Sequence, residues 1–159
     1  MILTGRQIRE LGIVEPHVPR TEISSGVITT SFGESFAGYD LRLNMMDGAT
    51  KIGDETWILK PGEFTLASAL ERFNMPNDIL GIVHDKSTWA RKGIAVQNTV
   101  IEPGWRGYLT LEITNHGSMP VVFCKGVGIC QVVFHRLEEP AVPYAGKYQD
   151  QGPEPTPAK

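Results

Sequence analysis

Residues 101–115 read IEPGWRGYLTLEITN, and this stretch decides the fold. It opens with a Pro-Gly turn and continues into a segment in which apolar and polar residues alternate. Leu109, Leu111 and Ile113 share one face, whereas Thr110 and Glu112 share the other. A period of two is typical of a strand with one buried face. The stretch therefore predicts a β-strand that carries a carboxylate, Glu112, on the face turned away from the core.

Outward from this stretch, the chain repeats the pattern of short strands separated by turns. The predicted strands are residues 26–32, 38–44, 56–60, 63–70, 78–85, 94–100, 108–115, 120–124 and 129–137. Turn residues recur about every ten residues, which is the spacing of a sandwich or barrel. One helix is predicted at residues 3–12, between an N-cap at Thr4 and Gly12, and a short second helix fits residues 87–92. The fold class is therefore predicted to be mainly β.

The chain divides by composition into one domain and a tail. With 159 residues it can form a single domain with a sizeable core, which we place at residues 1–143. Residues 144–159 contain few apolar side chains, and three of the last seven residues are proline. Such a segment is expected to be a mobile arm. An exposed tail needs no function, but Tyr144, Lys147 and Gln151 suit an arm that closes over a polar ligand.

Charge and hydropathy argue against two classes of partner. The net charge is −3, so no overall basic field draws the protein onto nucleic acid. No apolar run approaches the roughly 20 residues of a membrane span, and the first residues lack the apolar core of a signal peptide. We therefore expect a cytoplasmic protein that binds neither nucleic acid nor membrane.

The cysteines and histidines do not form a metal-binding pattern. Cys124 and Cys130 both lie among apolar residues and are expected to be buried free thiols. The four histidines are scattered, whereas a structural zinc site usually takes four Cys and His ligands. The pattern of zinc-dependent nucleobase deaminases is missing too. The sequence thus predicts no zinc and no metal held by protein side chains.

A basic and hydroxyl-rich segment forms the first candidate site. Lys86, Ser87, Thr88 and Arg91 place two cations and two hydroxyls within six residues. At the start of a helix, such groups could bind phosphate together with free backbone N–H groups. A solvated basic helix face would give the same pattern. The segment is not a Walker loop, because the required Gly-x-x-x-x-Gly-Lys frame is missing.

Two carboxylates form the second candidate site. Glu102 precedes a tight Pro-Gly turn and Trp105, and Glu112 lies on the outer face of its strand. A glutamate in that place is usually solvated. In a trimer, or beneath a closing arm, Glu112 could instead lose its water and serve as a proton carrier.

Taken in order, residues 38–43, 59–64, 86–93, 101–112 and 146–151 resemble the motifs of the dCTP deaminase family, in the dCTP deaminase and dUTPase superfamily. Residues 1–12 resemble the N-terminal helix of that family. The resemblance covers nearly the whole chain. It implies a distorted β-barrel, jelly-roll-like subunit of the dUTPase type. It also implies a homotrimer with its active sites at the subunit interfaces.

The same resemblance implies roles for individual residues. Glu112 matches the catalytic glutamate, and Glu102 falls where the family carries an aspartate near the sugar. The triphosphate, accompanied by Mg²⁺, is expected to contact Lys86, Ser87, Thr88 and Arg91. The deoxypyrimidine base and sugar are expected to contact Gln97, Asn98, Glu102, Trp105, Thr110 and Leu111. Tyr144, Lys147 and Gln151 match arm positions that contact nucleotide.

The chain departs from the family pattern in three places. Asp85-Lys86 replaces a Gly-Arg pair, which exchanges a bidentate guanidinium for a point charge. Glu102 replaces the aspartate and is longer by one methylene. The loop at Gln97 and Asn98 lacks the small and basic residues of many deaminases, and its amides could read cytosine or uracil.

The leading interpretation is a zinc-independent dCTP deaminase that forms dUTP and ammonia in pyrimidine deoxynucleotide metabolism, with Glu112 moving the protons. A bifunctional enzyme that forms dUMP, diphosphate and ammonia is the alternative, or a dUTPase-like hydrolase. In these alternatives Glu102 orients a water near the α-phosphate. A non-catalytic nucleotide-binding module is the third interpretation, since a fold alone does not determine function.

Overall fold

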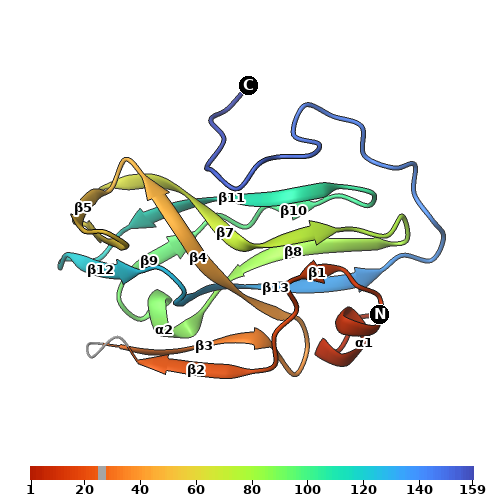
Figure 1. The fold of residues 1–159 in the computed structure, drawn as a ribbon, viewed down its shortest axis with the longest axis horizontal. Coiled ribbons are helices and arrows are strands. Elements are labelled where there is room, and N and C mark those ends of the chain that lie inside the picture. The colour runs from red at the N-terminus through yellow and green to blue at the C-terminus, as the bar shows by residue number, and fades with distance from the viewer. Residues whose placement is uncertain (25–27) are drawn as a thin grey trace.

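The computed structural model describes residues 1–24 and 28–159, and within them the chain is mainly β (Figure 1). The helices are α1 (Gly5–Glu10) and α2 (Ser87–Ala90). The strands are β1 (Val14–Glu15), β2 (Thr21–Ser24), β3 (Thr29–Glu34), β4 (Tyr39–Asp47), β5 (Thr50–Gly53), β6 (Thr56–Leu59), β7 (Phe64–Asn74), β8 (Ile79–Asp85), β9 (Ile94–Val96), β10 (Val100–Ile101), β11 (Arg106–Asn115), β12 (Val121–Cys124) and β13 (Gly128–Arg136). The predicted fold class is confirmed.

One large antiparallel sheet curls around the core. Its central path runs β10-β8-β13-β4-β7-β11-β9, with β1 paired to β7 and the β2–β3 hairpin joined to β4. Strand β4 crosses the sheet steeply, because it pairs with β13 along its first half and with β7 along its second half (Figure 1). A small second sheet, β12-β6-β5, closes one end. This curled sheet is the distorted barrel that the resemblance predicts.

The core is filled by the inward faces of the long strands. Leu111 and Ile113 of β11 are fully buried, as the alternation in this strand predicts. Trp89 of α2 stacks against Phe123 with ring centroids 4.7 Å apart, and its indole N–H donates to the carbonyl of Gly128. Each large apolar side chain buried in this way contributes about 1.5–3 kcal/mol. Helix α2 is thereby fixed against the barrel in spite of its short length.

Helix α1 has the start that the sequence predicts. The Thr4 hydroxyl accepts from the backbone N–H of Gln7, and the Gln7 side chain accepts from the backbone N–H of Thr4. This reciprocal pair is a capping box, which satisfies two backbone donors at the start of the helix. The helix is shorter than predicted and ends at Glu10 rather than at Gly12.

Several strand boundaries differ from the prediction. The predicted strand at 94–100 is two strands, because a turn formed by the bond from Thr99 N to Gln97 O interrupts it. Strand β5 was not predicted, since all four of its residues are exposed and give no alternation. The predicted strand at 26–32 begins at Gly26 and Val27, which lie outside the described residues, and β3 starts at Thr29.

An ion pair with a fully buried carboxylate, that of Glu71, joins β4 to β7. Arg42 donates from its backbone N–H to Glu71 Oε2 at 3.0 Å and from Nε to Oε1 at 2.7 Å. Burial raises the pKa of the Glu71 carboxyl, and the bonds from Arg42 lower it again. Arg42 provides the hydrogen bonds and the positive charge that the buried Glu71 carboxylate requires. The pair also links the neighbouring strands β4 and β7 through their side chains.

The last residues of the chain cross the outer side of β11 (Figure 1). Asp150 N donates to Arg106 O at 2.9 Å, and Tyr108 N donates to Gln151 O at 3.1 Å. Gly107 and Gln151 form a parallel bridge between these bonds. Residues 144–159 therefore lie docked on the domain in this structure, and the mobility of the arm stays a prediction. Among the described residues, no helix is long and apolar enough to cross a membrane.

Candidate active site

A hollow of about 520 Å³ lies between β11 and the C-terminal arm. Its domain side is formed by β7, β10 and β11 and by the turn before β11, and its roof is formed by the arm. Most of the wall is apolar, including Phe64 and Leu66 of β7. Thr99, Glu102, Thr110 and Glu112 are its polar contributors from the domain. A mostly apolar pocket with a few polar groups is the usual form of a small-molecule site.

Glu112 provides the one carboxylate on the strand face of this hollow. It lies on β11 opposite Leu66 of β7, so the alternation that buries Leu111 turns Glu112 outward into the hollow. Its Oε2 atom is buried and has no hydrogen-bond partner among the described residues. Burial raises the pKa of the Glu112 carboxyl above its usual range. A carboxylate with a raised pKa accepts and holds a proton more readily than a solvated glutamate does.

The neighbours of Glu112 on β11 face two different ways. Thr110 shares its face and accepts a hydrogen bond at 3.0 Å from the backbone N–H of Thr156 in the arm. Leu111 is fully buried in the core on the opposite face. Of the two β11 residues among those predicted to contact the base or sugar, Thr110 therefore offers its side chain to the hollow, and Leu111 can offer only its main chain.

The Pro-Gly turn positions the second carboxylate. Trp105 N donates to Glu102 O at 3.1 Å, and Gly104 at the turn adopts a φ of +77° that favours glycine. Glu102 is exposed and lines the hollow, and the Trp105 indole N–H donates to Tyr148 O at 2.7 Å. The turn thus brings the Glu102 carboxylate into the same hollow as Glu112 and anchors the arm beside it.

The loop after β9 lies beside the hollow, but its predicted residues do not line it. Gln97 and Asn98 are exposed, and Thr99, Val100 and Ile101 form the wall instead. The backbone N–H of Gln97 donates to Glu112 O at 3.0 Å, which places the loop next to the carboxylate. The amides of Gln97 and Asn98 lie close in the chain to the hollow but outside its wall.

The arm contributes two of its three predicted residues. Tyr144 and Gln151 line the hollow together with Tyr148. Lys147 is not part of the wall, since its Nζ contacts the main-chain oxygen of Lys159 and lies 5.1 Å from the centre of the Tyr148 ring. The distal residues Thr156, Pro157 and Ala158 complete the roof.

The predicted phosphate segment lies apart from the hollow in the folded chain. Lys86, Ser87, Thr88 and Arg91 do not line the hollow, and α2 lies on the side of the barrel opposite the arm (Figure 1). Lys86 Nζ is 2.5 Å from Asp40 Oδ2, and Arg91 Nε donates to Ser87 Oγ at 3.1 Å. A single chain therefore does not bring its phosphate segment and its carboxylate hollow together.

The sequence did not identify the apolar wall or the distal roof. Phe64 and Leu66 could have been recognised from the alternation in β7, once the pairing of that strand with β11 was known. Thr156 and its neighbours carried no such signal. Among the described residues, no group of three or more His, Cys, Asp or Glu side chains is arranged to hold a metal ion.

Comparisons with known proteins place this site in a family context. The family model described as dCTP deaminase-like matches residues 24–137. A dCTP deaminase from Acidobacterium capsulatum is 37% identical, over 94% of this chain and 94% of that protein. A dUMP-forming dCTP deaminase from Methanosphaera stadtmanae is 38% identical, over 78% of this chain and 64% of that protein.

Solved structures share the fold at lower identity. A crystal structure of 2′-deoxycytidine 5′-triphosphate deaminase from Agrobacterium tumefaciens matches with a TM-score of 0.65 and 18% identity. The match covers 85% of this chain and 47% of that longer one, so this chain spans about half of its length. Structures of dUTPases also match, with TM-scores of 0.52 to 0.55. The predicted dUTPase-type fold is thereby confirmed.

Proposed function

The chain belongs to the dCTP deaminase-like family, and on that premise we propose that it hydrolyses dCTP to dUTP and ammonia. The observation that supports this reaction most directly is the Glu112 carboxylate, whose Oε2 is buried without a partner in the wall of a hollow. The reaction belongs to pyrimidine deoxynucleotide metabolism, and we expect it to take place in the cytoplasm.

Glu112 can perform the proton transfers that the reaction needs. Water attacks C4 of the cytosine, and Glu112 accepts the proton that this water releases. Glu112 then passes the proton to N3. A second proton, from the hydroxyl now on C4, is carried to the amine. The C4–N bond breaks, ammonia leaves, and the C4 carbonyl of uracil remains. A raised pKa favours both halves of this cycle, because the carboxyl must hold the proton between steps.

The hollow is suited to a pyrimidine nucleoside. A volume of about 520 Å³ is within the range of roughly 300–1,000 Å³ that small-molecule sites occupy. Phe64 and Leu66 offer apolar surface to the flat base, and Thr110 offers a hydroxyl. The docked arm forms the roof of the hollow above the carboxylate. Tyr144 and Gln151 of the arm would contact the nucleotide from above.

We propose that the working form is a homotrimer, because one chain holds only part of the site. The arm that roofs the hollow lies on one side of the barrel, and α2, which begins at Ser87, lies on the other (Figure 1). A second copy would supply its own phosphate segment to this hollow. Mg²⁺ would accompany the triphosphate and neutralise part of its charge. Its ligands would be phosphate oxygens and water, since the described residues offer no cluster of three metal-binding side chains.

A bifunctional reaction is the second candidate. Glu102 places a second carboxylate in the hollow, where it could orient a water for release of diphosphate. The dUMP-forming relative from Methanosphaera stadtmanae favours the same idea. The chain would then form dUMP, diphosphate and ammonia from dCTP. Neither reaction uses zinc in our proposal. A non-catalytic nucleotide-binding module remains the third interpretation.

The products distinguish these candidates. The protein is incubated with Mg²⁺ and with dCTP, dUTP or dCMP separately, and ammonia and diphosphate are measured in each. We expect ammonia from dCTP without diphosphate. Ammonia together with diphosphate would identify the bifunctional enzyme, and diphosphate from dUTP alone would identify a dUTPase. No product from any nucleotide would refute the catalytic proposal.

A further inference from the structure

A buried carboxylate near the phosphate segment organises two cations. Asp40, in the motif at residues 38–43, has a side chain that is 4% exposed. Its Oδ2 accepts from Lys86 Nζ at 2.5 Å and from Ser31 Oγ at 3.1 Å. Arg20 Nη1 lies 3.9 Å from the same oxygen. Its Oδ1 is buried and has no hydrogen-bond partner among the described residues. Two positive side chains therefore meet at one negative one.

Lys86 is committed to this carboxylate. Its side chain is only 11% exposed, and its Nζ donates both to Asp40 and to Ser31. A buried carboxylate that loses its cation costs several kcal/mol, so Asp40 holds Lys86 in place. The residue that the sequence suggested for the phosphates is thus largely neutralised and turned inward.

Arg20 is the cation that stays available at this point. Its side chain is 42% exposed, and 3.9 Å from Asp40 is too long for a hydrogen bond. The guanidinium carbon lies 5.5 Å from the centre of the Phe36 ring, which is itself 86% exposed. This stacking orients the guanidinium, which among the described residues forms a long ion pair with Asp40 and donates no hydrogen bond. A guanidinium with free N–H groups is well matched to phosphate oxygens, which it can bind in pairs.

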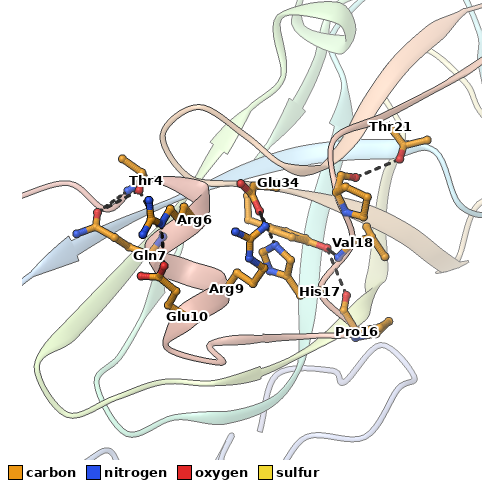
Figure 2. Close-up of polar contacts among 12 residues, drawn as sticks. Thr4, Arg6, Gln7, Arg9, Glu10, Pro16, His17, Val18, Thr21 and Glu34 are labelled. Carbon is orange, nitrogen blue, oxygen red and sulfur yellow. Dashed lines mark hydrogen bonds and ion pairs between the residues drawn. The ribbon is translucent and has the colours of Figure 1, made fainter.

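The nearby acid does not neutralise Arg20. Glu34 lines the same shallow hollow as Arg20 and Phe36. Figure 2 shows that its carboxylate is engaged by Arg9 and by His17, whose nitrogens each lie 3.0 Å from Glu34 Oε2. Asp40 is paired with Lys86, and Arg20 is the more exposed of the two cations beside it.

We propose that Arg20 is a polyphosphate-binding residue of the enzyme. Lys86 directly precedes Ser87, and Arg20 and Lys86 both lie next to Asp40 Oδ2. Arg20 is therefore adjacent to the predicted phosphate segment. Arg20 thereby supplies a guanidinium close to position 86, where the family pattern has arginine and this chain has lysine. This inference rests on the proposed function, because it assigns Arg20 to the phosphates of the same nucleotide.

The test compares binding of dCTP and dCMP, with Mg²⁺ present, to wild type, Arg20→Ala and the matched control Arg6→Ala. Arg6 lines the same hollow, but its charge is paired with Glu10, so its loss leaves the pairs of Glu34 intact. We expect Arg20→Ala to weaken dCTP binding at least tenfold and dCMP binding less than twofold. We expect Arg6→Ala to change dCTP binding less than twofold. Arg20→Lys should restore part of the affinity.

The outcomes separate this inference from the proposed function. Unchanged dCTP binding by Arg20→Ala would overturn the inference, as would an equal loss of dCTP and dCMP binding. An equal loss for Arg20→Ala and Arg6→Ala would also overturn it, since general surface charge would then explain the effect. Thermal unfolding of Arg20→Ala at the wild-type temperature shows that the fold is kept. If the wild type deaminates dCTP and these losses are missing, only the role of Arg20 fails. If the wild type binds neither nucleotide, the proposed function fails as well.

Discussion

Replacing Gly107 by alanine should release the C-terminal arm without unfolding the domain. Gly107 has a φ of +139°, and a Cβ built there would lie 2.7 Å from Gln151 N and 3.0 Å from Gln151 O. Real Cβ atoms do not approach backbone atoms so closely, so the arm has to move away. Its bonds at Asp150 N and Tyr108 N then break.

The size of the effect follows from those two bonds. A backbone hydrogen bond contributes about 1 kcal/mol net, so docking weakens by about 2 kcal/mol. Because about 1.4 kcal/mol corresponds to a factor of ten, the open fraction of the arm should rise about 30-fold. The amide hydrogens of Tyr108 and Asp150 should exchange faster by about the same factor.

The matched control is Gly126→Ala. Gly126 also has a positive φ, of +86°, but a Cβ there meets no atom within 4 Å. This variant carries backbone strain without touching the arm. We expect the exchange at Tyr108 and Asp150 to stay at the wild-type rate in Gly126→Ala. Unchanged exchange in Gly107→Ala would refute the reasoning, because the arm would then not be held against Gly107.

Three further predictions concern Lys86, Glu112 and Trp105. Lys86→Met should lower the free energy of unfolding by about 3 kcal/mol, because Asp40 stays buried without its cation. Urea unfolding measures this change, and a variant as stable as wild type would contradict a stabilising Lys86–Asp40 ion pair. The pKa of Glu112 is raised by folding, so the stability that it contributes is present below its ordinary pKa and is lost as pH rises through the folded value. Wild type should therefore lose stability relative to Glu112→Gln as pH rises above about 4.5, the ordinary pKa of this carboxyl, and a difference independent of pH would contradict the burial of this carboxyl. Removal of residues 144–159 should shift Trp105 emission to longer wavelength, since its indole loses Tyr148 O, while Trp57 and Trp89 stay buried; unchanged emission would show that the arm does not cover Trp105.

The pattern of β11 carried most of what could be predicted about the site. Alternation along one strand placed Leu111 inside and Glu112 outside, because side-chain direction in a strand is a local property. The turn at Glu102 was predictable for the same reason, since Pro-Gly chemistry acts within four residues. The fold class followed from the regular spacing of such strands and turns.

The rest depends on contacts between residues far apart in the chain. Lys86 was expected to face phosphate, but its partner Asp40 lies 46 residues earlier, and no local pattern indicates that pairing. Leu66 faces the hollow only because β7 pairs with β11. Thr156 reaches Thr110 from the far end of a proline-rich tail, in which composition predicted mobility and no contact. Local rules therefore placed the carboxylate, and the tertiary structure determined its surroundings.

The role of Glu112 can be tested most directly by measuring ammonia release from dCTP with wild type and Glu112→Gln side by side. The wild type should release ammonia without added zinc, and the variant should be at least about a hundredfold slower, the size of a lost proton-transfer group. The dissociation constant of dCTP, measured on the same samples, should change by no more than a few-fold. Full ammonia release by Glu112→Gln, or none by a wild type that binds dCTP, would contradict the account.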